Sequence, residues 1–543
     1  GVPVSDNWFV TYNPDTTTLP AMLVGRLPVR NEREATETVA KVIGYDNYQL
    51  SEWNKNFLFI TGGNDPGEQS LFNAYSEFMI STKVTPPPIG GTPFRVYKTT
   101  RGAIDGEHRA RLKELVRNGL VFINFIGHSG GRIWGVDIGP PAELENTNGK
   151  LPFVASTSCN VGGFGDPSSN VLAEEFVLAE QRGAIAAWAS STLGYPGYGK
   201  DLTNDFLQGL RDSLRSLGAL TTNARIKMLR LYGSDYIAVA TVHTNNLLGD
   251  PLSRFALPLQ PDLAITAQQI ELSNPTPTVN DTLVLVKVRF NNFGLVPSDS
   301  VGVTVTDVFN GQTTTLANNI KLPPTRQMDS LTVEWRGMEQ VGLHILTARL
   351  DPDNRIVEVN ELNNIASREA YVYANAVSVV KPIRNMVVPP GIQRLLVTSP
   401  IGIDSVGFVY EFQLDTVDTF DSPALISSGS IAPTAVTGEW LTPPLENDRV
   451  YFWRARTRYA TTLGNWVESS FSTASDAPAL RNSPTLSPAT AYSSSSEYRY
   501  ITPAPNPPAA PAGCAYASVT KRTPASMFIC VAATAGRTHE EMP

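Results

Sequence analysis

The stretch "LVFINFIGHSGG" at residues 120–131 decides the fold class of the N-terminal part of this chain. Its apolar run has the length of a buried strand and ends abruptly beside His128. A second run, "LPFVASTS" at 151–158, ends in the same way just before Cys159. Near-continuous apolar strands separated by helical patterns are typical of a largely parallel sheet covered on both faces. Two further runs of this kind are "NFLFITGG" at 56–63 and "GAIAAWASS" at 183–191.

The segments between these runs have helical periodicity, which predicts an α/β fold up to about residue 257. The second of them contains Asp105, which we expect to cap its helix. The third ends at Gly183, as a helix followed by glycine does. The predicted helices cover residues 32–48, 105–119, 168–183, 201–218 and 221–233.

The hydrophobic pattern of the sequence changes after "LLGDPLSRFALP", where apolar and polar residues begin to alternate with a period of two. This alternation, punctuated by Asn, Asp, Gly and Pro, predicts two all-β sandwiches in succession. The last part is rich in Ser, Pro, Ala and Thr and has too little apolar surface to order itself. We therefore predict four parts: an α/β domain at 1–257, β-sandwiches at 258–375 and 376–474, and a linker and tail at 475–543.

Composition and charge exclude several classes of protein. The net charge of -8 is mild for 543 residues and the chain has no Lys/Arg run, which argues against a nucleic-acid partner. The longest apolar stretches, about eight to ten residues, are too short for a transmembrane helix. The sequence opens with "GVPVSDNWFV", without Met or a basic-then-apolar leader, and we interpret it as processed or truncated at its N-terminus.

The chain has three cysteines, and only Cys159 lies outside the tail that holds Cys514 and Cys530. This spacing excludes a disulfide framework and a CxxC metal site. A lone Cys is commonly a small buried hydrophobe, and a His at a strand end is commonly a structural residue. The polar flank "STSCN" is unusual for a core thiol, however, and favours a chemical role.

His128 and Cys159 are predicted to face each other. Reactive groups gather beyond the carboxyl ends of parallel strands, and both residues end an apolar run. An imidazole beside a thiol activates it and can later protonate a leaving amine. The surrounding glycines let a substrate approach the backbone, whose N–H groups at Ser129 and Cys159 are suited to hold an oxyanion.

"FINFIGHSGGRIWG" and "LPFVASTSCNVGGF" together resemble the gingipain-type cysteine peptidases, whose fold is caspase-like. The resemblance extends through "SDNWFV", "AMLVGRLPVRNEREATETVAKVIGYDNY" and "LLGDP", and so covers roughly residues 1 to 257. It implies that His128 is the general base and Cys159 the nucleophile, with the amides of Ser129 and Cys159 as oxyanion donors.

Two positions depart from the family pattern. Members read Gly then Ser after the His, whereas this chain has Ser129 then Gly130. The acid that orients the His in some members precedes a Gly-Gly pair, and that position is Thr61 here. Asp65 or Glu68 in the following loop would substitute for it, unless the enzyme acts as a Cys-His dyad.

The sequence also gives expectations for the substrate pocket and for cofactors. The loop at 191–200 is expected to form one wall of a substrate pocket, and we assign Trp134, Trp188 and Tyr195 to that pocket, although Trp in such a setting is often core. No acid is placed at the base of an S1 pocket. We expect no required cofactor and no metal; the Asp/Asn-rich turn at 351–364 is compatible with calcium but also typical of an ordinary turn.

The two sandwiches resemble a CARDB-like adhesion module ("PDLAI", "FNNFG", "EVNELNN") and a fibronectin type III-like module ("YEFQLDT", "VYFWRAR"). Such modules imply an extracellular or bacterial cell-surface protein whose sandwiches contact secretion machinery, glycans or other proteins. "PAPNPP" is similar to the start of a surface-sorting domain.

The leading hypothesis is a secreted or surface cysteine endopeptidase that acts on protein or peptide substrates through a Cys159 acyl-enzyme. Two alternatives stay open: an inactive adhesion or secretion scaffold, and a sortase-like transpeptidase that uses the same Cys-His pair.

Overall fold

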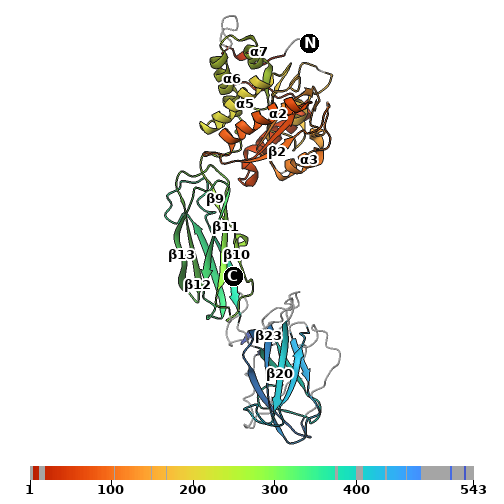
Figure 1. Cartoon of the computed structure of the whole chain (residues 1–543), viewed down its shortest axis with the longest axis vertical. Helices are drawn as coiled ribbons and strands as arrows, with labels where there is room; N and C mark the ends of the chain where they lie inside the picture. The colour runs from red at the N-terminus through yellow and green to blue at the C-terminus, as the bar shows by residue number, and fades with distance from the viewer. Residues whose placement is uncertain are drawn as a thin grey trace. The chain divides into compact units, whose positions relative to one another are not determined.

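The computed structural model describes residues 4–11, 19–102, 104–147, 149–166, 168–279, 281–373, 377–398, 408–434, 437–459, 462–477, 514–515 and 531–532. The chain divides into two compact units, Gly1–Val372 and Tyr373–Pro543. The first unit holds the α/β part and one β-sandwich, and the second holds the other β part (Figure 1). Most of the predicted linker and tail lies outside the described residues.

A six-stranded sheet in the order β2-β1-β3-β6-β7-β8 forms the centre of the N-terminal part. All neighbouring pairs are parallel except β7 and β8, which are antiparallel. The predicted largely parallel sheet is therefore confirmed. The strands are β1 (Asn56–Gly62), β2 (Thr92–Tyr97), β3 (Phe122–Gly127), β6 (Phe153–Ser156), β7 (Ala186–Ser190) and β8 (Asn245–Leu248).

Both faces of this sheet are buried, as its continuous apolar strands require. Along β1, Phe57 and Phe59 pack into one hydrophobic core, while Leu58 and Ile60 pack into the other. Residues of α2, α5, α6 and α7 complete the first core, and residues of α3 and α4 complete the second. The helices are α1 (Glu32–Asp46), α2 (Pro66–Met79), α3 (Arg109–Asn118), α4 (Leu172–Leu178), α5 (Pro196–Arg211), α6 (Leu217–Tyr232) and α7 (Tyr236–Thr244).

Three details differ from the sequence-based expectation. The helix expected at 105–119 begins only at Arg109, and Asp105 is not its cap: its side chain accepts from the Glu107 N–H in the preceding turn. The helix expected at 168–183 is confined to α4, because the chain turns into β7 after Leu178. The helices α2 and α7 and the strands β2 and β8 were not expected. Shorter elements are η1 (Asn7–Val10), η2 (Glu52–Lys55), η3 (Ile80–Val84), η4 (Pro141–Glu143), and the hairpin of β4 (Ser129–Gly130) and β5 (Ile133–Trp134).

The first β-sandwich consists of two antiparallel sheets, β10-β11-β14 with β9 added to β11, and β13-β12-β15-β16. Alternate residues of β11 are buried between the sheets, as the period-two pattern predicted. Its elements are β9 (Leu263–Ala264), η5 (Ala267–Gln269), β10 (Ile270–Leu272), β11 (Val284–Asn292), β12 (Val301–Phe309), β13 (Gln312–Leu322), β14 (Met328–Trp335), β15 (Gly342–Leu350) and β16 (Ile365–Val372).

The second unit is also all-β and packs around the buried Trp453. One sheet has the order β17-β19-β22, and the other has β18-β25-β23-β20-β21 with β24 on β23. Its likeness to a fibronectin type III module stays a prediction. The strands are β17 (Ser378–Lys381), β18 (Met386–Val388), β19 (Arg394–Thr398), β20 (Phe408–Asp415), β21 (Ile426–Ile431), β22 (Thr437–Leu441), β23 (Val450–Tyr459), β24 (Thr462–Leu463) and β25 (Val467–Thr473), and the short pair β26 (Cys514–Ala515) and β27 (Val531–Ala532) follows.

Candidate active site

The strands β3 and β6 bring His128 and Cys159 to one edge of the sheet. The two strands are parallel neighbours whose last paired residues are Phe125 and Ser156. His128 and Cys159 each follow this pair by three residues, beyond the carboxyl ends of their strands. Reactive groups gather at this edge in open α/β sheets.

His128 is held through its backbone between β1 and the hairpin that follows it. Its N–H donates to the Gly62 carbonyl at 3.3 Å, and its own carbonyl accepts from the Gly135 N–H at 2.8 Å. This close approach requires glycine before the histidine, because a Cβ on Gly127 would lie 2.7 Å from the Gly62 Cα. The imidazole packs edge-on near the Phe72 ring of α2, at 6.4 Å between centroids, and remains 48% exposed.

The carboxylate of Glu68 faces the imidazole of His128. Both Glu68 oxygens lie 3.0 Å from Nε2 of the ring, and Oε2 also accepts from the Asn64 N–H at 2.8 Å. This backbone hydrogen bond, together with the bond and charge of His128, holds the pKa of Glu68 below its usual value against the opposing effect of partial burial. Glu68 is therefore an ionised partner for an imidazolium.

Asp65, the other candidate for the orienting acid, has a structural role instead. It is the N-cap of α2, and its Oδ1 accepts from the N–H groups of Gly67 and Glu68 at 2.8 and 3.1 Å. By starting α2 at this point, Asp65 places Glu68 in the first helical turn. Thr61 is buried, and its hydroxyl bonds to Asn73 Oδ1 at 2.5 Å. Of these three residues, the structure brings only Glu68 to His128.

Cys159 is held by two neighbouring segments. The Gly194 N–H donates to Sγ at 3.4 Å, and the Ser129 hydroxyl donates to the Cys159 carbonyl at 2.7 Å. The Ser129 side chain, which departs from the family pattern, thus joins the His-bearing hairpin to the Cys-bearing turn. The role of the Ser129 and Cys159 amides as oxyanion donors stays a prediction.

Only one of the three aromatic residues assigned to the substrate pocket has exposed surface. Trp134 and Trp188 are 1% and 0% exposed, and their Nε1 atoms donate to Ser156 Oγ and to the Asn245 carbonyl, respectively. Both indoles are core residues, because they fill the two hydrophobic layers beside the sheet. Tyr195 is half-buried and directly follows Gly194, so it is the one of the three that has exposed surface near Cys159.

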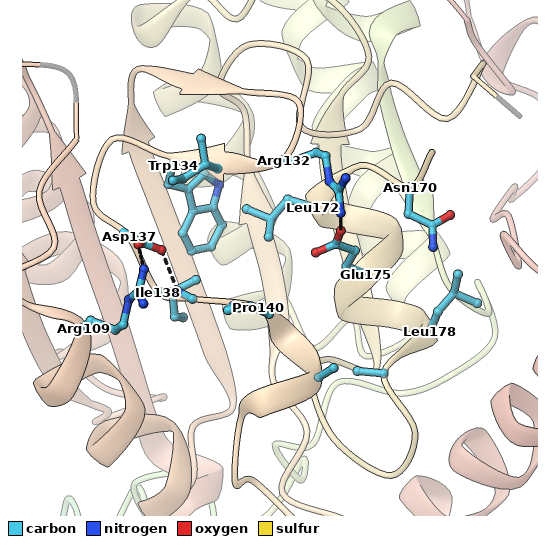
Figure 2. A pocket seen from close by; sticks show the side chains of 14 residues that line it. Arg109, Arg132, Trp134, Asp137, Ile138, Pro140, Asn170, Leu172, Glu175 and Leu178 are labelled. Carbon is cyan, nitrogen blue, oxygen red and sulfur yellow. Dashed lines mark hydrogen bonds and ion pairs between the residues drawn. The ribbon is translucent and has the colours of Figure 1, made fainter. Parts of the chain in front are cut away.

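A pocket of about 550 Å³ is lined in part by Trp134 of β5 and by residues of α4 (Figure 2). Trp134 and Leu172 line its apolar part, and the ion pairs Arg109–Asp137 and Arg132–Glu175 flank it. His128 and Cys159 are not among its lining residues.

Among the described residues, no group of three or more His, Cys, Asp or Glu side chains is arranged to hold a metal ion. In the Asp/Asn-rich turn at 351–364, the Asp351 carboxylate accepts from the Ile356 N–H at 2.7 Å. Asn364 Nδ2 donates to Glu358 at 2.9 Å. Both side chains thus have partners within the turn.

Gly194 provides a test of this geometry. A Cβ at this position would lie 2.2 Å from the Thr157 carbonyl, so Gly194→Ala must shift the loop away from Cys159. We expect kcat/KM for peptide hydrolysis to fall by about 10²-fold, a loss typical of a misplaced catalytic group. Gly197→Ala is the matched control, because a Cβ there meets its nearest neighbour, the Tyr75 hydroxyl, only at 3.8 Å. Equal kinetics for the two variants would contradict a role for the Gly194 contact.

The N-terminal α/β part matches a family of cysteine peptidases. Residues 1–256 match the model of peptidase family C25, the gingipain family, and residues 260–368 match the CARDB model. The chain therefore consists of a gingipain-like C25 peptidase domain followed by a CARDB domain and further β structure.

Several solved structures are similar to parts of the chain. The complex of Porphyromonas gingivalis RgpB pro- and mature domains is 14% identical, with coverage of 68% of this chain and 80% of that one and a TM-score of 0.39. A structure described as a protease is 13% identical, with coverage of 68% and 78% and a TM-score of 0.41. A CARDB domain from Pyrococcus furiosus, solved in complex with di-metal ions, is 28% identical, with coverage of 21% and 91% and a TM-score of 0.17. The curated proteins include no match.

Proposed function

We propose that this chain is a cysteine endopeptidase with Cys159 as nucleophile and His128 as general base. The observation that carries the proposal is the grouping of three residues beyond one sheet edge: the Glu68 carboxylate lies 3.0 Å from His128 Nε2, and Ser129, next to His128, donates to the Cys159 carbonyl at 2.7 Å. If Nε2–H donates to Glu68, the lone pair of the neutral imidazole is on Nδ1, which is the nitrogen available as a base.

In the proposed reaction, His128 takes the thiol proton and Sγ attacks the peptide carbonyl carbon. The resulting oxyanion is held by backbone N–H groups, for which we nominate Ser129 and Cys159. His128 then protonates the leaving amine as the C–N bond breaks, which leaves a thioester on Cys159. Water, deprotonated by His128, attacks the thioester and releases the acid, while the returning proton restores the thiol.

The domain that follows supports an extracellular or cell-surface location. A C25 peptidase implies a protein or peptide substrate, and the CARDB sandwich supplies a separate surface for a glycan, a protein or the secretion machinery. Within the part of the chain that the structure describes, no helix is both long and apolar enough to cross a bilayer. The proposed chemistry requires no cofactor and no metal.

Labelling with peptidyl acyloxymethyl ketones tests the proposal. We expect a panel that differs at P1 to label the wild-type chain at Cys159, and Cys159→Ala to remain unlabelled. The preferred probe then identifies the P1 side chain, and added amine nucleophiles distinguish hydrolysis from transpeptidation by the product formed. A wild-type chain that stays unlabelled across the panel, also after limited proteolysis, would refute the peptidase and leave the inactive scaffold.

A further inference from the structure

The N-terminal segment Val4–Asn7 docks against the same two loops that hold Cys159. One loop is the turn at 159–165, and the other is the connection at 190–195 between β7 and α5. The two loops are joined to each other by backbone hydrogen bonds, from Asn160 N to the Thr192 carbonyl at 2.7 Å and from Gly162 N to the Ser190 carbonyl at 2.8 Å. Support for one loop therefore stabilises the other.

Val4 contacts both loops directly. Its carbonyl accepts from the Ser191 hydroxyl at 2.6 Å, three residues before the Gly194 N–H that donates to Cys159 Sγ. On the other side, Val4 lies against the turn that follows Cys159, because a Cβ at Gly165 would come within 2.6 Å of Val4 Cγ1.

A second link runs through Arg26. Its Nε and Nη2 donate to the two carboxylate oxygens of Asp6 at 2.7 and 2.6 Å, a bidentate ion pair in which the Asp6 side chain is only 9% exposed. The guanidinium also lies over the Phe164 ring at 4.2 Å from its centroid. Arg26 thus joins the N-terminal segment to the turn that follows the nucleophile.

The segment itself is fixed firmly to the body of the domain. The Asn7 side chain is almost fully buried, and its Nδ2 lies within hydrogen-bond distance of the carbonyls of Val242, His243 and Asn245, at 3.0 to 3.1 Å. The Asp6 N–H donates to Asn246 Oδ1 at 2.9 Å. The attachment to α7 and β8 makes Val4–Asn7 a rigid support rather than a loose strand.

We infer that Val4–Asn7, together with Arg26 and Ser191, forms a positioning element that braces the two Cys159 loops. The inference rests on the proposed peptidase function, which it deepens by adding residues that act on the nucleophile through the loops. None of them contacts the reacting atoms, so their effect is on the order and placement of Cys159.

Hydrogen exchange detected by mass spectrometry tests the bracing without any substrate. We expect Arg26→Met and the milder Ser191→Ala to raise amide exchange at least about fivefold in peptides covering 159–165 and 190–195, because local opening frees these amides. The control is Arg95→Met, which breaks the bidentate ion pair between Arg95 and Glu77. The two arginine side chains have similar exposure, 41% for Arg95 and 39% for Arg26. Unchanged exchange in both peptides in both test variants would overturn the inference.

Labelling of Cys159 by the preferred acyloxymethyl ketone tests the consequence for the reaction. We expect the second-order rate constant to fall about tenfold in Arg26→Met and to stay at the wild-type value in Arg95→Met, because a nucleophile held loosely spends less time in a reactive geometry. Increased exchange with an unchanged labelling rate would also overturn the positioning role. A wild-type chain that does not react removes the peptidase proposal alone, since the exchange experiment still decides the bracing.

Discussion

Replacing Cys159 by alanine is expected to lower kcat/KM for peptide hydrolysis by at least about 10⁴-fold, because the acyl-enzyme cannot form without the thiolate. His128→Ala should cost nearly as much, since the thiol then has no base and the leaving amine no acid. When two residues act as one unit, their losses do not add. The kcat/KM of the double variant should therefore be little lower than that of either single variant.

The two cysteines of the tail provide the matched control for this prediction. Cys514→Ala and Cys530→Ala remove the same atom, and both should keep wild-type kinetics. Cys159→Ala should stay folded: we expect its melting temperature within a few degrees of wild type, the shift that a change of about 1 kcal/mol in stability produces. Substantial hydrolysis by purified Cys159→Ala would show that another group, or a contaminating peptidase, performs the reaction.

The sheet, and the position of His128 and Cys159 beyond the carboxyl ends of its strands, could be predicted because both signals are local. The apolar run that ends at Gly127-His128 indicates where one strand ends, and the polar "STSCN" indicates the end of the strand before Cys159. The rule that parallel strands present reactive groups at one edge then places the two residues together. The parallel pairing of β3 and β6 and the hydrogen bond from Ser129 to the Cys159 carbonyl are consistent with this placement.

The sequence analysis left the choice between Asp65 and Glu68 open, because it depends on α2. The segment "PGEQSLFNAYSEFM" begins with Pro and Gly, which are uncommon inside helices, and its helix was not expected. Once Asp65 is recognised as its cap, Glu68 falls in the first turn, where it faces His128. An "NDPGE" sequence, with Asp as N-cap and Pro at N1, was the signal that could have revealed this start.

Long-range contacts to the backbone were equally beyond prediction. Gly194 lies 35 residues from Cys159, and Ser129 lies 30 residues from it, yet both form hydrogen bonds with it. Lys41 is another example, because its buried ammonium meets the carbonyls of Val177 and Ala179 at the end of α4 at 2.7 and 2.8 Å. A backbone N–H or carbonyl carries no side-chain identity, so no residue pattern marks these partners.

Glu68→Gln is expected to lower kcat by about 10⁴-fold with little change in KM, as loss of the acid of a Ser-His-Asp triad does. Glu68 is a positioning residue: it touches the imidazole rather than the substrate, so substrate affinity should persist. The neutral amide can donate to Nε2 as well as accept from it, and it no longer stabilises the imidazolium that forms when His128 takes the thiol proton. Steady-state kinetics at saturating peptide separates kcat from KM.

Asp65→Asn is the control that separates the two carboxylates. Asparagine is as good an N-cap as aspartate, so α2 should form and kcat should stay within about twofold of wild type. If Asp65→Asn instead lost as much activity as Glu68→Gln, the orienting acid would have to be reassigned.

The pH dependence of stability provides a second readout for Glu68. Because the pKa of Glu68 is below its usual value in the folded chain, the unfolded chain binds its proton more tightly, and the carboxylate stabilises the fold above the unfolded pKa of about 4.3. This contribution is lost as the pH falls through the lowered folded pKa. The difference in melting temperature between wild type and Glu68→Gln should therefore be present at neutral pH and shrink in acid. A difference that stayed constant down to about pH 3 would mean that the carboxylate charge does not stabilise the fold through Asn64 and His128, since protonation removes that charge in this range.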